Sequence, residues 1–426
     1  MNKNTEQANA IEQIGGVSLA FLKQKYDTPL QILDQEHFED RCELFKTHFK
    51  SPIETEIAYA SKAHLNLHIA QTIAQKGLSF DVASMGELYI LQEAGVDLRK
   101  VYFHGNNKLE KELRYAIEHQ VGHIVLDNID EANLLMTLLE EYETQQAVLI
   151  RVNPTVHTNT HEYIKTSEVD SKFGIALKDP QLFALIEALN KHHYIHLDGF
   201  HAHIGSQIFE KASFYEAATT LLAFYRKIEN QYQLDLSILN LGGGFGVAYT
   251  ESDPHLDLGT FLSEYAQRVA AEITAYDLPI KKIIIEPGRS LINQSMHTLY
   301  TVGSQKMTLS GKQYVFVDGG MSDNIRPALY QADYSANVFT NNTQETTYTI
   351  AGKLCESGDV LIENHKDKLP EKDDLILIKN TGAYTMSMSS NYNKMLRPAL
   401  VAVKNGQDQL VVRRETLADL IRLDVV

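Results

Sequence analysis

The sequence predicts an α/β protein, a (β/α)8 (TIM) barrel followed by a β-rich C-terminal domain that the N-terminal segment completes. Through the first two-thirds of the chain, short apolar runs alternate with amphipathic segments of helical length, as in parallel strands joined by helical crossovers. After Gly288, strand-like runs follow one another with few helical segments between them. An open doubly wound sheet is the alternative, but such sheets usually stop at about five or six strands.

Eight strand candidates predict the barrel, because each is a short apolar run followed by a segment with apolar residues at three- and four-residue steps. Eight such units in sequence are the number that closes a barrel. The strand candidates are Ile57–Lys62, Phe80–Ser84, Val101–Gly105, His123–Asp127, Ala147–Asn153, His196–Gly205, Ser237–Gly243 and Lys282–Pro287. The helix candidates are Leu67–Lys76, Met85–Ala94, Leu109–His119, Glu131–Tyr142, Gln181–Asn190, Ser213–Gln231 and Phe261–Tyr276.

The C-terminal third predicts a sheet, and Asn405-Gly406 between two strand-like runs is a hairpin signal. The segment around Gly16–Leu33 is expected to join this sheet. We therefore expect a barrel domain at 36–288 and a β-rich domain made of 1–35 and 289–426. The strand candidates of the second domain are Tyr314–Val317, Tyr348–Gly352, Asp374–Lys379, Leu400–Lys404 and Gln409–Arg413.

Composition narrows the class of protein. The 426 residues are 44% apolar and 22% charged, as in an ordinary globular chain. A formal charge of −16 argues against nucleic acid or an anionic membrane as the partner. No apolar run approaches a membrane span, and the first residues lack the apolar core of a signal peptide. Cys42 and Cys355 lie too far apart to suggest a disulfide framework, so we expect a cytoplasmic protein.

Polar and glycine-rich motifs follow the predicted barrel strands at the ends where (β/α)8 barrels build their active sites. These motifs are distant in sequence, and we expect them to converge on one pocket. They include Lys62, Asp81, Ser84, His104-Gly105-Asn106-Asn107, Arg151-Val152-Asn153-Pro154, His201-Ala202-His203-Ile204-Gly205-Ser206, Gly242-Gly243-Gly244 and Glu286-Pro287-Gly288-Arg289.

Three of these motifs suggest a phosphorylated aromatic cofactor. Partial burial of Lys62 would lower the pKa of its amine and make it a nucleophile, whereas a solvated surface lysine is the ordinary alternative. Glu286 could keep a pyridine nitrogen protonated and make the ring an electron sink, although a surface ion pair is possible. The glycine triplet at Gly242–Gly244 lets backbone N–H groups approach a phosphate, and a tight turn is an equal alternative.

Two further motifs concern the metal question and proton transfer. His201 and His203 share one face of a strand, but no third ligand pattern is visible, so we predict no metal site. One imidazole stacked on a cofactor ring is the better interpretation. Cys355 lies in a turn-like segment with Glu and Gly neighbours. A free cysteine is most often a core residue, but this context favours an accessible proton donor.

At these motifs the chain resembles the fold-type III pyridoxal-phosphate (PLP) decarboxylases over essentially its whole length, and within them the branch that acts on diaminopimelate. The motifs shared by the wider family are Tyr59–Ala63, Phe80–Ser84, Gly242–Gly244 and Glu286–Arg289. The more discriminating ones are His104–Lys108, Ser171–Gly174, Gly319–Tyr330, Cys355–Asp359, Gly382–Tyr384 and Arg413–Thr416.

The resemblance implies pyridoxal 5′-phosphate as the cofactor, carried by the Lys62 amine. It further implies that His203 stacks on the ring and that Glu286 pairs with the pyridine nitrogen. The other cofactor contacts are expected from Asp81, Ser206, Gly242, Gly243, Gly244, Gly288, Arg289 and Tyr384.

The implied reaction is decarboxylation of meso-2,6-diaminopimelate at its D-centre to L-lysine and CO2, the last step of lysine biosynthesis. Cys355 would return the proton to the carbon that loses CO2. Glu356 would hold the distal amino group, and a homodimer is implied because Cys355 and Glu356 reach in from the partner subunit. The distal carboxylate is expected to bind Arg289, Arg326 and Tyr330, and Tyr384 is expected to contact the substrate as well as the cofactor.

Other functions remain as alternatives. A related decarboxylase could act on another carboxylate-bearing diamino acid, of the carboxynorspermidine or siderophore-precursor type. A catalytically dead binding protein should lack Lys62 or Cys355, and both are present. The chain departs from the family at His64, usually Asn, and at Thr166-Ser167, usually Thr-Gly. Neither departure removes a chemical group from the implied reaction.

Overall fold

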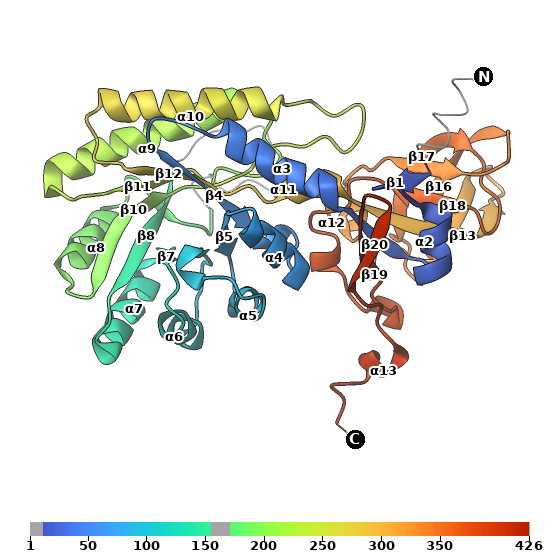
Figure 1. Cartoon of the computed structure of the whole chain (residues 1–426), viewed down its shortest axis with the longest axis horizontal. Coiled ribbons are helices and arrows are strands. Elements are labelled where there is room, and N and C mark those ends of the chain that lie inside the picture. Colours follow the sequence, from blue (N-terminus) through green and yellow to red (C-terminus); the bar gives the residue numbers. More distant parts are fainter. Residues whose placement is uncertain (1–11, 155–170, 426) are drawn as a thin grey trace. The chain divides into compact units, whose positions relative to one another are not determined.

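The computed structural model describes residues 12–154 and 171–425 of the chain, and these form two compact units (Figure 1). The barrel unit consists of Arg41–Val247 and Pro254–Ser290. The β-rich unit consists of the described part of Met1–Asp40, the short segment Ala248–Asp253, and Leu291 onward.

The barrel unit is a closed parallel barrel, which confirms the predicted fold class. Each strand pairs with its neighbours in parallel, and the sheet closes because β12 pairs with β4 and β10 pairs with β8. A two-residue strand that the sequence did not predict, β9 (Ile175–Ala176), adds to β8. The eight barrel strands are β4 (Glu54–Ala60), β5 (Ser79–Val82), β6 (Val101–Phe103), β7 (His123–Leu126), β8 (Gln146–Asn153), β10 (Ile195–His201), β11 (Ile238–Asn240) and β12 (Lys282–Ile285).

Helices follow the strands as crossovers, and α9 and α10 lie side by side (Figure 1). Polar caps start several of them directly after a strand-end loop: the side chains of Asn66, Ser84 and Asn128 each accept a hydrogen bond from a first-turn N–H group. Each predicted helix is present. The crossover helices are α4 (Leu67–Gln75), α5 (Met85–Glu93), α6 (Glu110–Glu118), α7 (Ile129–Tyr142), α8 (Pro180–Lys191), α9 (Lys211–Tyr232) and α10 (Leu258–Ala275).

The β-rich unit is built on the long strand β13 (Met296–Met307), which the sequence analysis missed. β3 (Leu30–Asp34) pairs with β13 antiparallel and with β19 in parallel, so the N-terminal segment completes this sheet as predicted. The hairpin at Asn405-Gly406 is also confirmed, with φ values of 53° and 74°. The remaining strands are β14 (Gln313–Val317), β15 (Ala336–Phe339), β16 (Glu345–Ala351), β17 (Val360–Lys368), β18 (Leu375–Ile378), β19 (Ala399–Lys404) and β20 (Gln407–Val412).

The missed strands share a physical reason. β13 is buried in its first half and exposed over its last five residues, and β17 ends in the polar run Asn364–Lys368. Neighbouring strands hydrogen-bond to the backbone of such a segment whether or not its side chains alternate between apolar and polar. The sequence pattern therefore gives little indication that the segment is a strand. No helix in the described part of the chain is long and apolar enough to cross a membrane.

Candidate active site

Polar side chains of the barrel unit gather at the carboxyl ends of its strands, as the sequence predicted. Lys62 lies in the single 3-10 turn directly after β4, and Asp81 lies in β5. His104 follows β6, His201 is the last residue of β10, and Glu286 follows β12. Since the strands are parallel, these ends meet at one mouth of the barrel.

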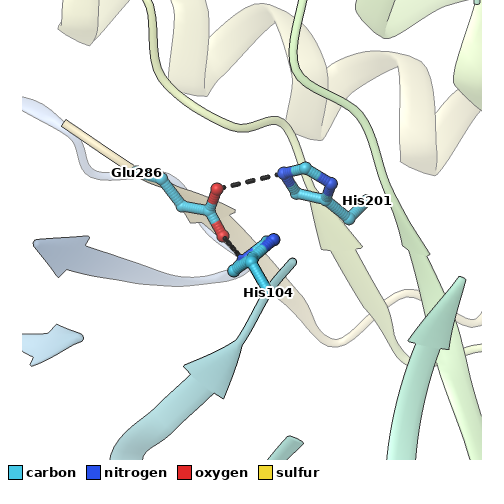
Figure 2. A group of neighbouring side chains, drawn as sticks. All are labelled: His104, His201 and Glu286. Carbon is cyan, nitrogen blue, oxygen red and sulfur yellow. Dashed lines mark hydrogen bonds and ion pairs between the residues drawn. The ribbon is translucent and has the colours of Figure 1, made fainter. Parts of the chain in front are cut away.

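Glu286 is the centre of this cluster (Figure 2). Its Oε1 accepts hydrogen bonds from His104 Nε2 at 2.8 Å and from Asn240 Nδ2 at 2.7 Å. Its Oε2 accepts from His201 Nε2 at 3.0 Å. Burial alone raises the pKa of the Glu286 carboxyl, but His104 and His201 outweigh burial and hold the pKa well below its usual value. Glu286 is therefore a buried anion.

The partners of Glu286 define what this anion can bind. Burial lowers the pKa of His201 to about 4, so its imidazole is neutral at physiological pH. A carboxylate only accepts hydrogen bonds, so the imidazoles of His104 and His201 present Nε2–H to it. Three donors then occupy three of the about four acceptor positions of the carboxylate. The remaining position suits a cationic N–H group, such as a protonated pyridine nitrogen.

The same cluster corrects one argument made from the sequence. The sequence paired His201 with His203, but ligand atoms of His201 lie within 4.8 Å of those of His104 and Glu286, and His203 is not part of this group of three. The direct hydrogen bonds of 2.8 and 3.0 Å favour the carboxylate-centred arrangement. A tetrahedral zinc ion about 2.0–2.2 Å from each ligand would need the ligand atoms roughly 3.3 Å apart. The absence of a metal site stays a prediction.

Lys62 and Asp81 lie beside this cluster. The Lys62 amine is 3.8 Å from Asp81 Oδ2, and the lysine side chain is 47% exposed. Burial raises the pKa of Asp81, whereas His104 and Lys62 act to lower it. His104 Nε2 is 3.7 Å from Asp81 Oδ1, so the imidazole of His104 lies between the carboxylates of Asp81 and Glu286. The structure thus brings Lys62 and Glu286, the two residues predicted to contact the cofactor, into one network through Asp81 and His104.

The glycine triplet Gly242–Gly244 forms the tight turn that the sequence offered as one of its two roles, and its contact with a phosphate stays a prediction. Gly242 and Gly244 have φ values of +63° and +102°, which L-residues with a side chain rarely adopt. A Cβ on Gly243 would lie 2.0 Å from the backbone oxygen of Glu286, so the strand ends pack too closely for any side chain. Gly243 N–H donates to His203 Nδ1 at 3.2 Å. The triplet is a tight turn whose backbone can approach a ligand.

Ser206 and Arg289 form a polar pair in the barrel unit. Arg289 Nη2 donates to Ser206 Oγ at 3.2 Å, and the arginine is buried. Burial also lowers the pKa of His203 well below its usual value, so this imidazole is neutral and can stack on an aromatic ring. An amine, a buried carboxylate, a glycine turn and the Ser206–Arg289 pair, of which only the arginine is buried, are groups of the kind that can hold PLP. The donor set fits that cofactor, and the individual contacts stay predictions.

In the β-rich unit, Arg326 is the buried cation. It begins α12 (Arg326–Tyr330), and its Nη1 donates to the hydroxyls of Tyr249 at 2.6 Å and Tyr334 at 3.0 Å. The ring of Tyr330 lies 5.9 Å from its guanidinium carbon. A buried guanidinium among tyrosines can bind a carboxylate, and the contact of Arg326 with the substrate stays a prediction.

Cys355 is exposed, as the sequence predicted, and its role as a proton donor stays a prediction. Cys355 N–H donates to Asn393 Oδ1 at 2.6 Å, and Tyr392 donates its hydroxyl to Glu356 Oε2 at 3.2 Å. The carboxylate of Asp359 accepts from the backbone N–H groups of Met321 at 2.6 Å and Leu354 at 2.8 Å. Asp359 therefore fixes the cysteine segment to the Gly319–Tyr330 motif.

Tyr384 lies in the β-rich unit and has a left-handed backbone, with φ 60°. The Ser171–Gly174 motif belongs to the barrel unit, where Gly174 N–H donates to Asp127 Oδ1 at 3.0 Å. Arg151 lies over the Phe173 ring at 4.5 Å and is 3.7 Å from Asp127 Oδ2. Asp127 and Arg151 thus hold this motif, while the Thr166-Ser167 departure lies outside the described residues.

Four residues that bond to Glu286 or Arg326 carried little signal in the sequence. His104 was noted only as part of a motif, and Asn240, Tyr249 and Tyr334 were not noted. Asn240 could have been found, because it is a polar residue at the end of an apolar strand two positions before the glycine triplet. Tyr249 and Tyr334 had no local signal, since a tyrosine in a loop or turn is an ordinary core residue.

Comparison with known proteins identifies the family of this chain. Residues 35–293 match the family model described as "Pyridoxal-dependent decarboxylase, pyridoxal binding domain". A diaminopimelate decarboxylase from Bacillus subtilis is 44% identical over 97% of this chain and 95% of its own length. The chain is thus a PLP-dependent enzyme of the decarboxylase class, which confirms the cofactor implied by the resemblance.

Solved structures show which family within the PLP-dependent decarboxylases the chain resembles. Diaminopimelate decarboxylase from M. jannaschii, in complex with L-lysine, has a TM-score of 0.90 and 30% identity over 96% of this chain and 94% of its own. The Helicobacter pylori enzyme with L-lysine has a TM-score of 0.88 and 29% identity, covering 95% and 98% of the two chains. This chain belongs to the diaminopimelate decarboxylase family.

Proposed function

We propose that the chain decarboxylates meso-2,6-diaminopimelate at its D-centre to give L-lysine and CO2. The observation that carries the choice of substrate is the buried Arg326 guanidinium, which has two tyrosine hydroxyls as partners. Such a cation binds a substrate carboxylate far from the reacting carbon. Simple diamine-forming substrates such as lysine and ornithine lack that carboxylate. The L-lysine bound to two structural relatives supports the same assignment.

Each group of the chain then has a role in the reaction. Lys62 supplies the amine that attaches PLP, and PLP when bound acts as the electron sink for the broken C–CO2 bond. Glu286, kept anionic by its three donors, holds the ring nitrogen in its protonated form. Cys355 gives the proton that replaces CO2 on the carbon. Glu356 binds the distal amino group.

A carboxylate-bearing diamino acid of the carboxynorspermidine or siderophore-precursor type is the second candidate substrate. A siderophore precursor with a second carboxylate also satisfies Arg326, whereas carboxynorspermidine carries only the carboxylate that decarboxylation removes and leaves Arg326 without an anion. The siderophore-precursor type differs from diaminopimelate at the distal amino group. Glu356 is an exposed carboxylate next to the Cys355 segment and favours the substrate with a free distal amine.

The deciding experiment measures CO2 and lysine release by PLP-loaded protein given meso-diaminopimelate, with LL-diaminopimelate, L-lysine and L-ornithine in parallel. Lysine should form only from the meso isomer. Lys62→Ala should abolish turnover and the absorbance of covalently bound PLP, while Lys100→Ala, an exposed lysine, should change neither. A wild-type protein with bound PLP that leaves the meso isomer untouched would refute the substrate assignment.

We also propose a homodimer in which Cys355 and Glu356 act in the partner's active site. The exposure of both residues in the β-rich unit supports this. Inactive Lys62→Ala and Cys355→Ala proteins, mixed and allowed to exchange subunits, should regain about a quarter of wild-type activity, because half of the dimers have one intact site. No recovery from subunits shown to exchange would contradict shared sites.

The reaction is proposed to take place in the cytoplasm. Both cysteines are free thiols, and Cys355 is exposed, which suits a reducing compartment. Cell fractionation, with activity in the soluble fraction, tests this assignment.

A further inference from the structure

The surroundings of Arg326 indicate more than the presence of a cation. The residue is 6% exposed, and in the described part of the chain its Nε has no hydrogen-bond partner. No carboxylate of residues 12–154 or 171–425 forms an ion pair with it. The rings of Tyr249, Tyr330 and Tyr334 lie between 5.0 and 6.0 Å from its guanidinium carbon. A buried guanidinium in neutral surroundings is costly unless an anion completes it.

The two hydrogen bonds of Arg326 select which edge of the guanidinium receives that anion. Both Tyr249 and Tyr334 accept from Nη1, at 2.6 and 3.0 Å. A guanidinium binds a carboxylate through two parallel N–H groups on one edge. With Nη1 held by the tyrosines and Nε without a partner, the Nε–Nη2 edge is the one presented for bidentate binding.

Tyr249 is itself held firmly within the β-rich unit. Its backbone oxygen accepts from Ser335 Oγ at 3.1 Å and Asn380 Nδ2 at 3.3 Å, and its N–H donates to Asp253 Oδ2 at 2.7 Å. Its ring meets the ring of Tyr334 edge to face, with centroids 5.2 Å apart. These contacts hold the backbone of Tyr249 in the position from which its hydroxyl accepts the hydrogen bond of Arg326.

We infer that Tyr249 and Tyr334 are positioning residues that fix Arg326 so that its Nε–Nη2 edge binds the carboxylate of the L-configured end of the substrate. The inference rests on the proposed function and adds two residues to it. Decarboxylation at the D-centre leaves the L-configured end intact in L-lysine. Tyr249 and Tyr334 therefore govern the affinity for the product as well as the KM for the substrate.

Tyr249→Phe and Tyr334→Phe test this, because each keeps the ring and removes only the hydroxyl. Calorimetry on the PLP-loaded enzyme compares L-lysine with cadaverine, which is lysine without its carboxylate. Each variant should bind L-lysine about tenfold more weakly, as expected for loss of a hydrogen bond to a charged group. Cadaverine affinity should stay as in the wild type. The KM for meso-diaminopimelate should rise about tenfold, with kcat changed less than about twofold.

Tyr348→Phe is the matched control, since it removes a tyrosine hydroxyl that bonds the backbone oxygen of Lys368 in the same unit. Tyr348→Phe should leave the affinities for L-lysine and cadaverine unchanged. If Tyr249→Phe and Tyr334→Phe weaken the affinity for L-lysine and for cadaverine equally, or change neither affinity, the positioning role is wrong. The proposed function still holds in that case if the wild-type enzyme turns over meso-diaminopimelate. A wild-type enzyme that neither turns over the meso isomer nor binds L-lysine overturns both the inference and the proposed function.

Discussion

His64 should make this protein sensitive to acid. Its ring is buried, Tyr59 donates its hydroxyl to the His64 backbone oxygen at 2.7 Å, and Asn66 Nδ2 lies 3.2 Å from His64 Nε2. Because an amide N–H can only donate, Nε2 accepts and the ring proton is on Nδ1. That Nδ1 is buried and meets no partner among the residues the structure describes. The folded protein therefore holds His64 neutral.

The magnitude follows from the pKa. Burial lowers the pKa of His64 from 6.5 to about 4. Between these values the unfolded chain binds a proton that the folded chain does not, so the free energy of unfolding falls as pH falls from 6.5 to about 4. At about 1.4 kcal/mol per pKa unit, His64 alone accounts for a loss of roughly 3 kcal/mol. Above pH 6.5 the full stability is present.

His64→Asn, which introduces the residue usual in the family, removes this titration. Urea unfolding followed by far-UV circular dichroism at several pH values should show a smaller loss of stability between pH 7 and pH 4, by about 3 kcal/mol. Other acid-sensitive groups are common to both proteins and cancel in the comparison. His255→Asn, at an exposed histidine, is the control and should behave as the wild type.

Hydrogen–deuterium exchange at the histidine Cε1 position, read by mass spectrometry, gives the pKa of His64 directly. A pKa at or above 6, or parallel stability curves for wild type and His64→Asn, would refute the reasoning. A difference in stability at pH 7 alone is not decisive, since replacing a buried ring also changes packing.

Three further outcomes are expected. Glu286→Gln keeps the shape of the side chain but removes its charge, so kcat should fall about 100-fold or more and the absorption spectrum of bound PLP should lose its protonated-ring form. Lys108→Met breaks the buried ion pair between Lys108 and Glu131, whose charged atoms lie 2.7 Å apart, and should lower the free energy of unfolding in urea by about 3–5 kcal/mol. The double change of Lys108 and Glu131 to Met should lower it by less than the sum of the two single changes. Gly243→Ala would place a methyl group 2.0 Å from a backbone oxygen, so PLP affinity in fluorescence titration and thermal stability should fall together.

The sequence by itself determined the order of strands and helices and the residues near the chemistry. Helical and strand periodicities differ, so the eight barrel units could be separated along the chain. Parallel strands bring their carboxyl ends together, so Lys62, Asp81 and Glu286 could be assigned to one mouth of the barrel. Strands such as β13 and β17 were lost because their exposed halves carry no alternation.

Only the tertiary structure decided which polar groups pair. His104 and Glu286 are 182 residues apart in sequence, and Tyr249 and Arg326 are 77 apart. No local pattern specifies contacts at such separations, because a hydrogen bond depends on ångström-scale distances that the packing of whole elements sets. The candidate residues for the chemistry could thus be found in the sequence, whereas the hydrogen-bond partners that fix their charge and orientation follow from the fold.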